Sequence, residues 1–393
     1  MKKFILLSAG LLLTVTLFAG CNNASSKNAD EKSNPDETTV RIASKKSSTK
    51  IQVAILLDTS GSMEGLIEQA KSRLWNIVNT LTTLKFEGEA PAIEIALYEY
   101  GSYRIKNSDY IRQVTPLTTD LDMISEDLFG LTTGGSEEYC GAVISQSVKS
   151  LEWGNNESDM KLIYIAGNEV FTQGKVPYKE AIQNALKKGI YVNTIHCGSS
   201  EVGIRDLWRD AAIRGKGKFF NIDSNAKIRY IVTPYDDRIS HYNMKLNDTY
   251  VSYGRLGFEK KANQTKQDTN AMSISKSNYT ERAVSKSKSA YKNSSWDLVD
   301  KIKTDKNILS EIRSDELPSE LQGKSKAEIE SILSQKEKER TTIQKEINDL
   351  AQKRQEYIDN ELQKESTSDD LGYAITQSVL DFAKEKGYTI EYN

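Results

Sequence analysis

Short apolar runs alternate with amphipathic stretches between residues 51 and 232 of the chain. Five of the runs are short and largely apolar, as buried strands are: 51–57, 92–98, 161–166, 190–195 and 218–222. Four stretches between them have apolar residues at roughly helical spacing: 66–81, 141–151, 178–188 and 204–213. Strands and helices that alternate in this way form a mostly parallel sheet with helices on both faces. The pattern therefore predicts an α/β domain over residues 51–233.

The pattern changes after this domain. Residues 234–323 are rich in Tyr, Asn, Ser and Lys with weak periodicity, so they form an extension to which the sequence assigns no packed fold. Residues 324–365 lack Gly and Pro and repeat apolar residues at spacings of three, four and multiples of seven, which predicts a long helix. Lys336, Arg340 and Arg354 interrupt its apolar seam, which favours packing on its own domain over a self-pairing coiled coil. A short helix and strand are expected in residues 366–393.

The N-terminal residues have the composition of an export signal. Lys2 and Lys3 precede an uncharged apolar run that is too short for a comfortable membrane span. The run ends in Leu-Phe-Ala-Gly-Cys at residues 17–21, which resembles a bacterial lipobox with Phe18 in place of the usual leucine. The sequence thus predicts a signal peptide over residues 1–20 and lipid attachment at Cys21. The alternatives are an ordinary cleaved leader and a crude N-terminal anchor.

Residues 21–50 contain hardly any large apolar side chain, so they are expected to form a flexible tether. A lipid at Cys21 and this tether would hold the protein at the periplasmic or cell-surface face of a bacterial membrane. The formal net charge of the chain is only -2, and this near-balance argues against a nucleic-acid binder. The chain has two histidines, too few for a histidine-rich zinc site, so we expect any metal site to use oxygen ligands.

A polar loop follows the first predicted strand and leads directly into a helix. It has the pattern Asp-x-Ser-x-Ser, with Asp58, Ser60 and Ser62. Ligands of open parallel sheets gather at the carboxyl ends of the strands, where these three side chains converge. Oxygen ligands suit a hard cation such as Mg²⁺, with Mn²⁺ or Ca²⁺ as alternatives. We expect Asp58 to supply charge through a bound water and the two serines to ligate directly, with one coordination position left open.

This motif resembles the metal-ion-dependent adhesion site of the von Willebrand factor type A family, whose domain is Rossmann-like. A second segment, Gly-Gly-Ser at residues 134–136 before a helix, is similar to the family loop that bears a Thr or Ser ligand, which implies that role for Ser136. The resemblance covers roughly residues 50–232. The chain departs from the family after the third run of strand residues: Asn168 and Glu169 stand where the family has an acidic Thr-Asp-Gly turn.

Either Asn168 or Glu169 compensates for the missing aspartate, or the site has a lower charge and a weaker affinity for metal. The adjacent Glu137 and Glu138 are further candidates for a supporting role. A family fold with a decayed site is the alternative to metal binding.

By resemblance, the implied function is capture of a partner protein, which offers an acidic side chain to the open position of the metal. Two other classes of function remain. The chain could be a structural protein of the cell envelope whose long helix mediates assembly and whose metal site is incidental. It could also be a phosphohydrolase with Asp58 as nucleophile, although such enzymes need a second aspartate where this chain has Ser60. The residues favour a binding module that is not an enzyme.

Two cysteines remain beside Cys21. Cys140 begins a predicted helix and Cys197 ends a predicted strand, both near the edge of the sheet that carries the polar loop. An exported compartment is oxidising, so the two could form a disulfide; the alternative is a pair of buried thiols.

Overall fold

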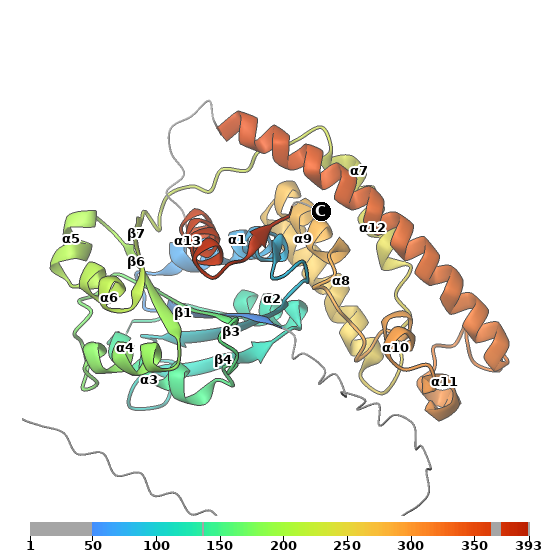
Figure 1. Ribbon diagram of the computed structural model, residues 1–393, viewed down its shortest axis with the longest axis horizontal. Helices are drawn as coiled ribbons and strands as arrows, with labels where there is room; N and C mark the ends of the chain where they lie inside the picture. The colour runs from blue at the N-terminus through green and yellow to red at the C-terminus, as the bar shows by residue number, and fades with distance from the viewer. Residues whose placement is uncertain (1–48, 136, 363–370, 392–393) are drawn as a thin grey trace, which may run out of the picture. The chain divides into compact units, whose positions relative to one another are not determined.

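The computed structural model describes residues 49–135, 137–362 and 371–391. A central sheet has the strand order β4-β3-β1-β5-β6-β7, and only β4 runs antiparallel to its neighbour (Figure 1). Its strands are β1 (Lys50–Asp58), β3 (Ala92–Tyr100), β4 (Ile111–Thr118), β5 (Met160–Gly167), β6 (Ile190–Cys197) and β7 (Lys216–Ile222). The predicted fold class, a mostly parallel sheet between helices, is confirmed.

Helices cover both faces of this sheet. One layer contains α1 (Glu64–Thr82) and α2 (Leu121–Phe129), and the other contains α3 (Cys140–Ser150), α4 (Tyr178–Lys187) and α6 (Trp208–Arg214) (Figure 1). The central strand β1 contributes side chains to the cores on both faces of the sheet, because successive side chains of a strand point to opposite faces. Val53 and Ile55 belong to the core under α1, while Ala54 and Leu56 belong to the core under α3. All nine residues of β1 except Lys50 are buried, which explains its continuous apolar sequence.

Each of the five strands predicted from the sequence is present, but the structure adds β2 (Leu84–Lys85), β4 and α2 to the predicted elements and divides one predicted helix. Strand β4 was not expected, because it is an edge strand with a proline and exposed polar residues and therefore lacks a clear alternation. The helix expected at 204–213 is divided into α5 (Ser200–Arg205) and α6 by Leu207, whose φ of 71° lies in the left-handed region. Gly189, with φ 69°, follows α4 and provides the left-handed turn that ends this helix.

The extension after the sheet is helical. It comprises α7 (Asp236–Asn247), α8 (Gly257–Ile274), α9 (Lys276–Ser287), α10 (Leu298–Thr304), α11 (Ile308–Glu311) and the long α12 (Lys326–Leu362). Helix α12 packs along α7 and α9 of the same chain. Two of the basic residues that interrupt its seam form buried ion pairs there: Arg340 Nη1 donates to Asp297 at 2.6 Å, and Arg354 Nε donates to Asp236 at 3.0 Å.

The last helix, α13 (Leu371–Glu385), returns to the sheet. It packs beside α1 and against β5, β6 and β7, and Ser378 Oγ donates to Asn193 Oδ1 on β6 at 2.9 Å. After it, β8 (Thr389–Ile390) pairs with β2 (Leu84–Lys85), which follows α1. The helical layer over this face therefore includes residues from the C-terminal end of the chain, beyond the limit of 233 expected from the sequence.

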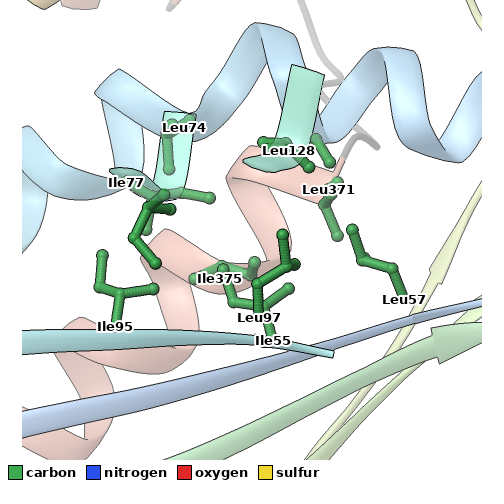
Figure 2. A pocket seen from close by; sticks show the side chains of 11 residues that line it. Ile55, Leu57, Leu74, Ile77, Ile95, Leu97, Leu128, Leu371 and Ile375 are labelled. Atoms are coloured by element: carbon green, nitrogen blue, oxygen red, sulfur yellow. The ribbon is translucent and has the colours of Figure 1, made fainter. Parts of the chain in front are cut away.

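A small void remains between α1, α2, α13 and the sheet (Figure 2). Its volume is about 20 Å³, and only apolar side chains line it, among them Ile55, Leu97 and Ile375. A space of this size holds no more than one water molecule, and no lining group would hydrogen-bond to it. The void is a packing gap in the core.

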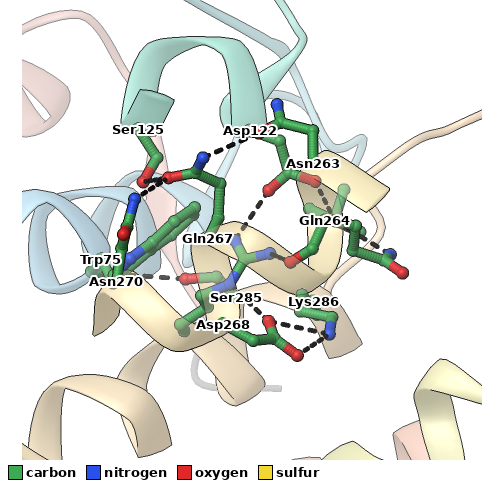
Figure 3. Close-up of polar contacts among 12 residues, drawn as sticks. Trp75, Asp122, Ser125, Asn263, Gln264, Gln267, Asp268, Asn270, Ser285 and Lys286 are labelled. Carbon is green, nitrogen blue, oxygen red and sulfur yellow. Dashed lines mark hydrogen bonds and ion pairs between the residues drawn. The ribbon is translucent and has the colours of Figure 1, made fainter. Parts of the chain in front are cut away.

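A buried polar network joins the extension to the helices of the sheet (Figure 3). At its centre the Arg282 guanidinium of α9 contacts Asp268 of α8 at 2.6 Å and Asp122 of α2 at 2.7 Å, and it lies 4.7 Å from the ring centroid of Trp75 on α1. Arg282 is fully buried. Because a buried charge is stable only when it is paired and hydrogen-bonded, this residue ties the four helices together.

Candidate functional site

A carboxylate lies buried where β1 ends. Asp58 is fully buried; its Oδ1 accepts a hydrogen bond from the Ser60 backbone N–H at 2.7 Å, while its Oδ2 has no hydrogen-bond partner. Burial, helped by the negative charge of Glu169, raises the pKa of Asp58 to about 7, and the hydrogen bonds from Ser60 limit this rise. A buried acceptor without a partner is costly, so this oxygen marks a position that a ligand would satisfy.

Hydroxyl and amide groups lie beside this carboxylate. Ser60 Oγ and Ser62 Oγ are 3.3 Å apart, and Asn168 Nδ2 donates to Ser62 Oγ at 3.2 Å. Asn168 follows β5, the neighbour of β1, so the carboxyl ends of two adjacent parallel strands supply the groups. The Oδ1 of Asn168 is a second buried oxygen without a hydrogen-bond partner. The structure thus brings together Asp58, Ser60, Ser62 and Asn168 of the expected set.

Glu138 completes the cluster. Only 6% of Glu138 is exposed. Its Cγ and Asp58 Oδ1 both lie 2.9 Å from the point where a Cβ on Gly101 would stand, so the two acidic side chains border one small space. Burial, then Asp58 and then Glu169, raise the pKa of Glu138 to about 8. Glu137 is exposed and accepts a hydrogen bond from the Tyr139 hydroxyl.

The sequence singled out neither of these two glutamates as a ligand. Glu137 and Glu138 are adjacent residues of the same type, and only their different burial in the structure distinguishes them. A sign was nonetheless present, since Glu138 lies two residues before a helix in the loop that carries the expected hydroxyl ligand.

The remaining expected ligands are Ser136 and Glu169. Ser136 lies outside the described residues, so its role stays a prediction. Glu169 is exposed and accepts a hydrogen bond from Gln173 Nε2 at 3.4 Å; it acts on Asp58 and Glu138 through its charge. Among the described residues no three His, Cys, Asp or Glu side chains form a recognisable metal-binding group. The cluster at β1 differs from such groups because three of its expected ligands, Ser60, Ser62 and Ser136, are hydroxyls.

A family model described as the von Willebrand factor type A domain matches residues 52–234. These residues are a von Willebrand factor type A domain. The sequence resemblance is thereby confirmed over the sheet and the polar loop, and the extension from α7 to α12 lies beyond the match.

Solved structures similar to the chain include BatB, a conserved hypothetical protein from Bacteroides thetaiotaomicron. It is 17% identical, with a TM-score of 0.34, and the match covers 44% of this chain and 90% of that one. A von Willebrand factor type A protein from Catenulispora acidiphila is also 17% identical, with a TM-score of 0.34 and coverage of 44% and 39%. The pilus adhesin SpaC from Lactobacillus rhamnosus GG is 12% identical, with a TM-score of 0.34 and coverage of 45% and 28%. Curated protein sequences give no significant match.

Two cysteines of the von Willebrand factor type A domain lie close to the cluster. In the structure both Cys140 and Cys197 are free and buried, so the two residues are thiols and not the disulfide that the sequence allows. Cys140 Sγ lies 3.9 Å from the hydroxyl of Tyr100, and burial raises the pKa of both thiols. They are packing residues of the domain, since a neutral buried thiol behaves as a small apolar group.

Gly101 gives a test of how tightly the domain packs around Asp58. Its φ is 83°, and an added Cβ would meet both carboxyl side chains at 2.9 Å. Gly88 has a similar φ of 79°, with nothing within 4 Å of an added Cβ. We expect Gly88→Ala to cost about 1–2 kcal/mol for its left-handed backbone alone. Gly101→Ala should cost about 1–3 kcal/mol more, as overpacking does. Urea unfolding measures the free energy of unfolding of both variants. Equal losses would show that an added Cβ at Gly101 fits beside the two acidic side chains without overpacking.

Proposed function

We propose that this chain is a metal-dependent protein-binding module, displayed on a bacterial membrane through a lipid at Cys21. One observation carries the proposal: at the carboxyl end of β1 the buried Asp58 has an oxygen without a partner, beside the hydroxyls of Ser60 and Ser62. Buried charge of this kind is stable when it coordinates a metal. The membership of residues 52–234 in the von Willebrand factor type A family supports the same function.

The residues fit a hard divalent cation. Asp58, Ser60 and Ser62 would hold it, with Ser136 as a fourth ligand, and Asn168 or, less directly, Glu169 in support. Carboxylate and hydroxyl oxygens suit Mg²⁺, which keeps several waters, and also Mn²⁺ or Ca²⁺. When bound, the cation supplies a directional contact to an anionic oxygen. We propose that this oxygen belongs to an acidic side chain of a partner protein.

Loops around the cluster would select this partner by shape and charge. Tyr103, 55% exposed, contributes an aromatic side chain beside Gly134, and Tyr110 and Tyr139 pack together with ring centroids 6.2 Å apart. Exposed tyrosines are common at the centres of protein interfaces because they bury a large apolar area and keep a polar tip.

Catalysis is not part of the proposal. A phosphohydrolase with Asp58 as nucleophile needs a second carboxylic acid two residues later, and Ser60 stands there with its hydroxyl 3.3 Å from that of Ser62. A serine hydroxyl in this position does not replace a general acid.

Glu138 would supply the second carboxylate that Asn168 cannot. We expect Glu138→Gln to weaken the affinity for Mg²⁺ about 10- to 100-fold, the usual effect of losing a supporting group beside a metal. Glu137→Gln is a matched control, because it removes the same charge one residue away from an exposed side chain. Isothermal calorimetry with Mg²⁺ gives both affinities. If the two variants bind alike, the second carboxylate has no part in holding the cation.

The membrane location rests on the sequence, because Cys21 lies outside the described residues. No helix among the described residues is long and apolar enough to cross a membrane. We expect Cys21→Ser to move the protein from the membrane fraction to the soluble fraction, since it removes the thiol that carries the lipid. Immunoblots of fractionated cells measure this, with Cys197→Ser as the control that retains the anchor. A Cys21→Ser protein that stays with membranes would contradict lipid attachment at this residue.

A further inference from the structure

The loop between β5 and α4 contacts the loop that carries Glu138. Gln173 Oε1 accepts a hydrogen bond from the Glu138 backbone N–H at 3.0 Å. One residue further along, the Tyr139 ring packs against Gly174, where an added Cβ would stand only 2.7 Å from Tyr139 Cδ1. The helices that follow the two loops, α3 and α4, lie side by side (Figure 1). The two loops therefore meet beside the candidate metal site.

The loop that contains Gln173 is fixed to the rest of the domain. Phe171 is fully buried, and its ring packs edge-on against Trp208 with centroids 4.9 Å apart. The Phe171 backbone N–H donates to the Asp206 carbonyl at 3.0 Å. Trp208 Nε1 donates to the Glu169 carbonyl at 2.8 Å. Because these contacts hold the loop just before Gln173, its side chain projects from a backbone with little freedom to move.

The hydrogen bond to Gln173 bears on the direction of the Glu138 side chain. The Glu138 carbonyl accepts a hydrogen bond from the Cys140 N–H at 3.2 Å, so the peptide groups on both sides of the Glu138 Cα are held. The backbone on either side of a Cα sets the direction of its Cβ. Glu138 points inward and is buried, whereas the adjacent Glu137 is exposed. The bond to Gln173 thus favours the backbone conformation that directs Glu138 toward Asp58.

Gln173 uses its second polar group on the same cluster. Its Nε2 donates to Glu169 Oε2 at 3.4 Å, which is a long hydrogen bond. Glu169 lies close enough for its charge to act on both Asp58 and Glu138. The side-chain amide therefore lies between two acidic residues, where it accepts from a backbone N–H and donates to a carboxylate without adding charge.

We propose that Gln173 is a positioning residue, which holds Glu138 turned toward Asp58 and so fixes the second carboxylate of the metal site. It acts through the Glu138 backbone and needs no contact with the cation. The inference rests on the proposed function, because the direction of Glu138 affects function only if a cation binds there. A carboxylate that is already in place adds more to affinity than one whose loop must first be ordered, since ordering costs conformational free energy.

The first measurement is the hydrogen-exchange rate of the Glu138 amide in the metal-free chain, followed by NMR in EDTA. Gln173→Met keeps the length of the side chain and removes the acceptor oxygen, so exchange should become about tenfold faster or more. Gln173→Glu keeps an oxygen that accepts from the amide, so its exchange should stay slow. Thr172→Val is the matched control, since Thr172 is exposed in the same loop and its replacement leaves Gln173 intact.

The second measurement is the affinity of the same variants for Mg²⁺, by calorimetry without EDTA. Gln173→Met should bind Mg²⁺ about tenfold more weakly, as is usual when a group that orients a metal ligand is lost. Gln173→Glu should bind at least as tightly as the unchanged chain, because it retains the acceptor and adds no positive charge. Urea unfolding of each variant checks that the fold is kept.

The two measurements separate this proposal from the proposed function. If the unchanged chain binds no Mg²⁺, the metal-dependent function fails, and the exchange rates still decide whether Gln173 holds Glu138 in place. The proposal is overturned if the Glu138 amide exchanges alike in Gln173→Met and Thr172→Val. It is also overturned if exchange is faster in Gln173→Met while the affinity for Mg²⁺ stays that of the unchanged chain, since the hydrogen bond then serves stability alone.

Discussion

Replacing Asp58 by alanine is expected to abolish the binding of Mg²⁺ and Mn²⁺. Asp58 is the central carboxylate of the cluster, and without it Ser60 and Ser62 offer only neutral hydroxyls, which do not hold a strongly hydrated divalent cation alone. Calorimetry should give saturable heat for the unchanged chain and none for the variant. Capture of partner proteins should be lost in the same variant and on adding a chelator to the unchanged chain. Asp349→Ala, at an exposed aspartate of α12, should change neither result.

The same carboxylate predicts how stability depends on pH in chelator. The pKa of Asp58 is raised to about 7, so between its ordinary pKa and pH 7 the folded chain binds more protons than the unfolded chain. Stability contributed by this group is therefore present in acid and declines as the pH rises toward 7. Asp58→Asn keeps the shape and removes the titration, so its stability should lack that decline. Identical pH profiles for the two chains would argue that Asp58 is well solvated.

The second large effect is expected at Arg282. Its guanidinium is fully buried against Asp122 and Asp268, so Arg282→Ala leaves Asp122 without its cationic partner and Asp268 with Lys286 as its remaining one. Breaking a buried ion pair in this way costs about 3–5 kcal/mol. Burial raises the pKa of Asp268, but Lys286 and Arg282 outweigh it and hold that pKa well below its usual range. The stabilisation is thus present at neutral pH and is lost as the pH falls into acid.

Urea unfolding at neutral pH measures this loss. Arg313→Ala is the control, because Arg313 pairs with Asp315 on the surface, where salt bridges contribute little. No measurable change is expected there. The double variant Arg282→Ala with Asp122→Ala should lose less than the sum of the single losses, since the two side chains share one interaction. A loss at Arg282 as small as that at Arg313 would mean that the network does not join the extension to the domain.

The buried network also explains why the extension could not be assigned from its sequence. Helices α8 and α9 bury Gln264, Gln267, Asp268, Arg282 and Lys286, all of which are polar. A pattern of apolar residues indicates a helix only when the buried face is apolar. The strands gave the opposite case: β1 and β5 are buried on both faces, so their apolar sequences predicted them well.

The candidate site was predictable where it depends on one loop. Asp58, Ser60 and Ser62 follow a strand directly, and Asn168 follows its neighbour, so the parallel sheet brings them to one edge. Glu138 was harder to predict from the sequence, because the backbone of the loop decides which of two adjacent glutamates points inward. The place of α13 was also hidden, since the long extension separates this helix from the strands that it covers.

The central claim is that one divalent cation binds at the carboxyl end of β1. Crystals of the chain grown with Mn²⁺, measured at a wavelength where manganese scatters anomalously, test it directly. We predict one anomalous peak beside Asp58, Ser60 and Ser62, with an oxygen from water or another molecule completing its shell. A peak elsewhere, or a map without one in which these three side chains point to different places, would contradict metal-dependent binding at this site.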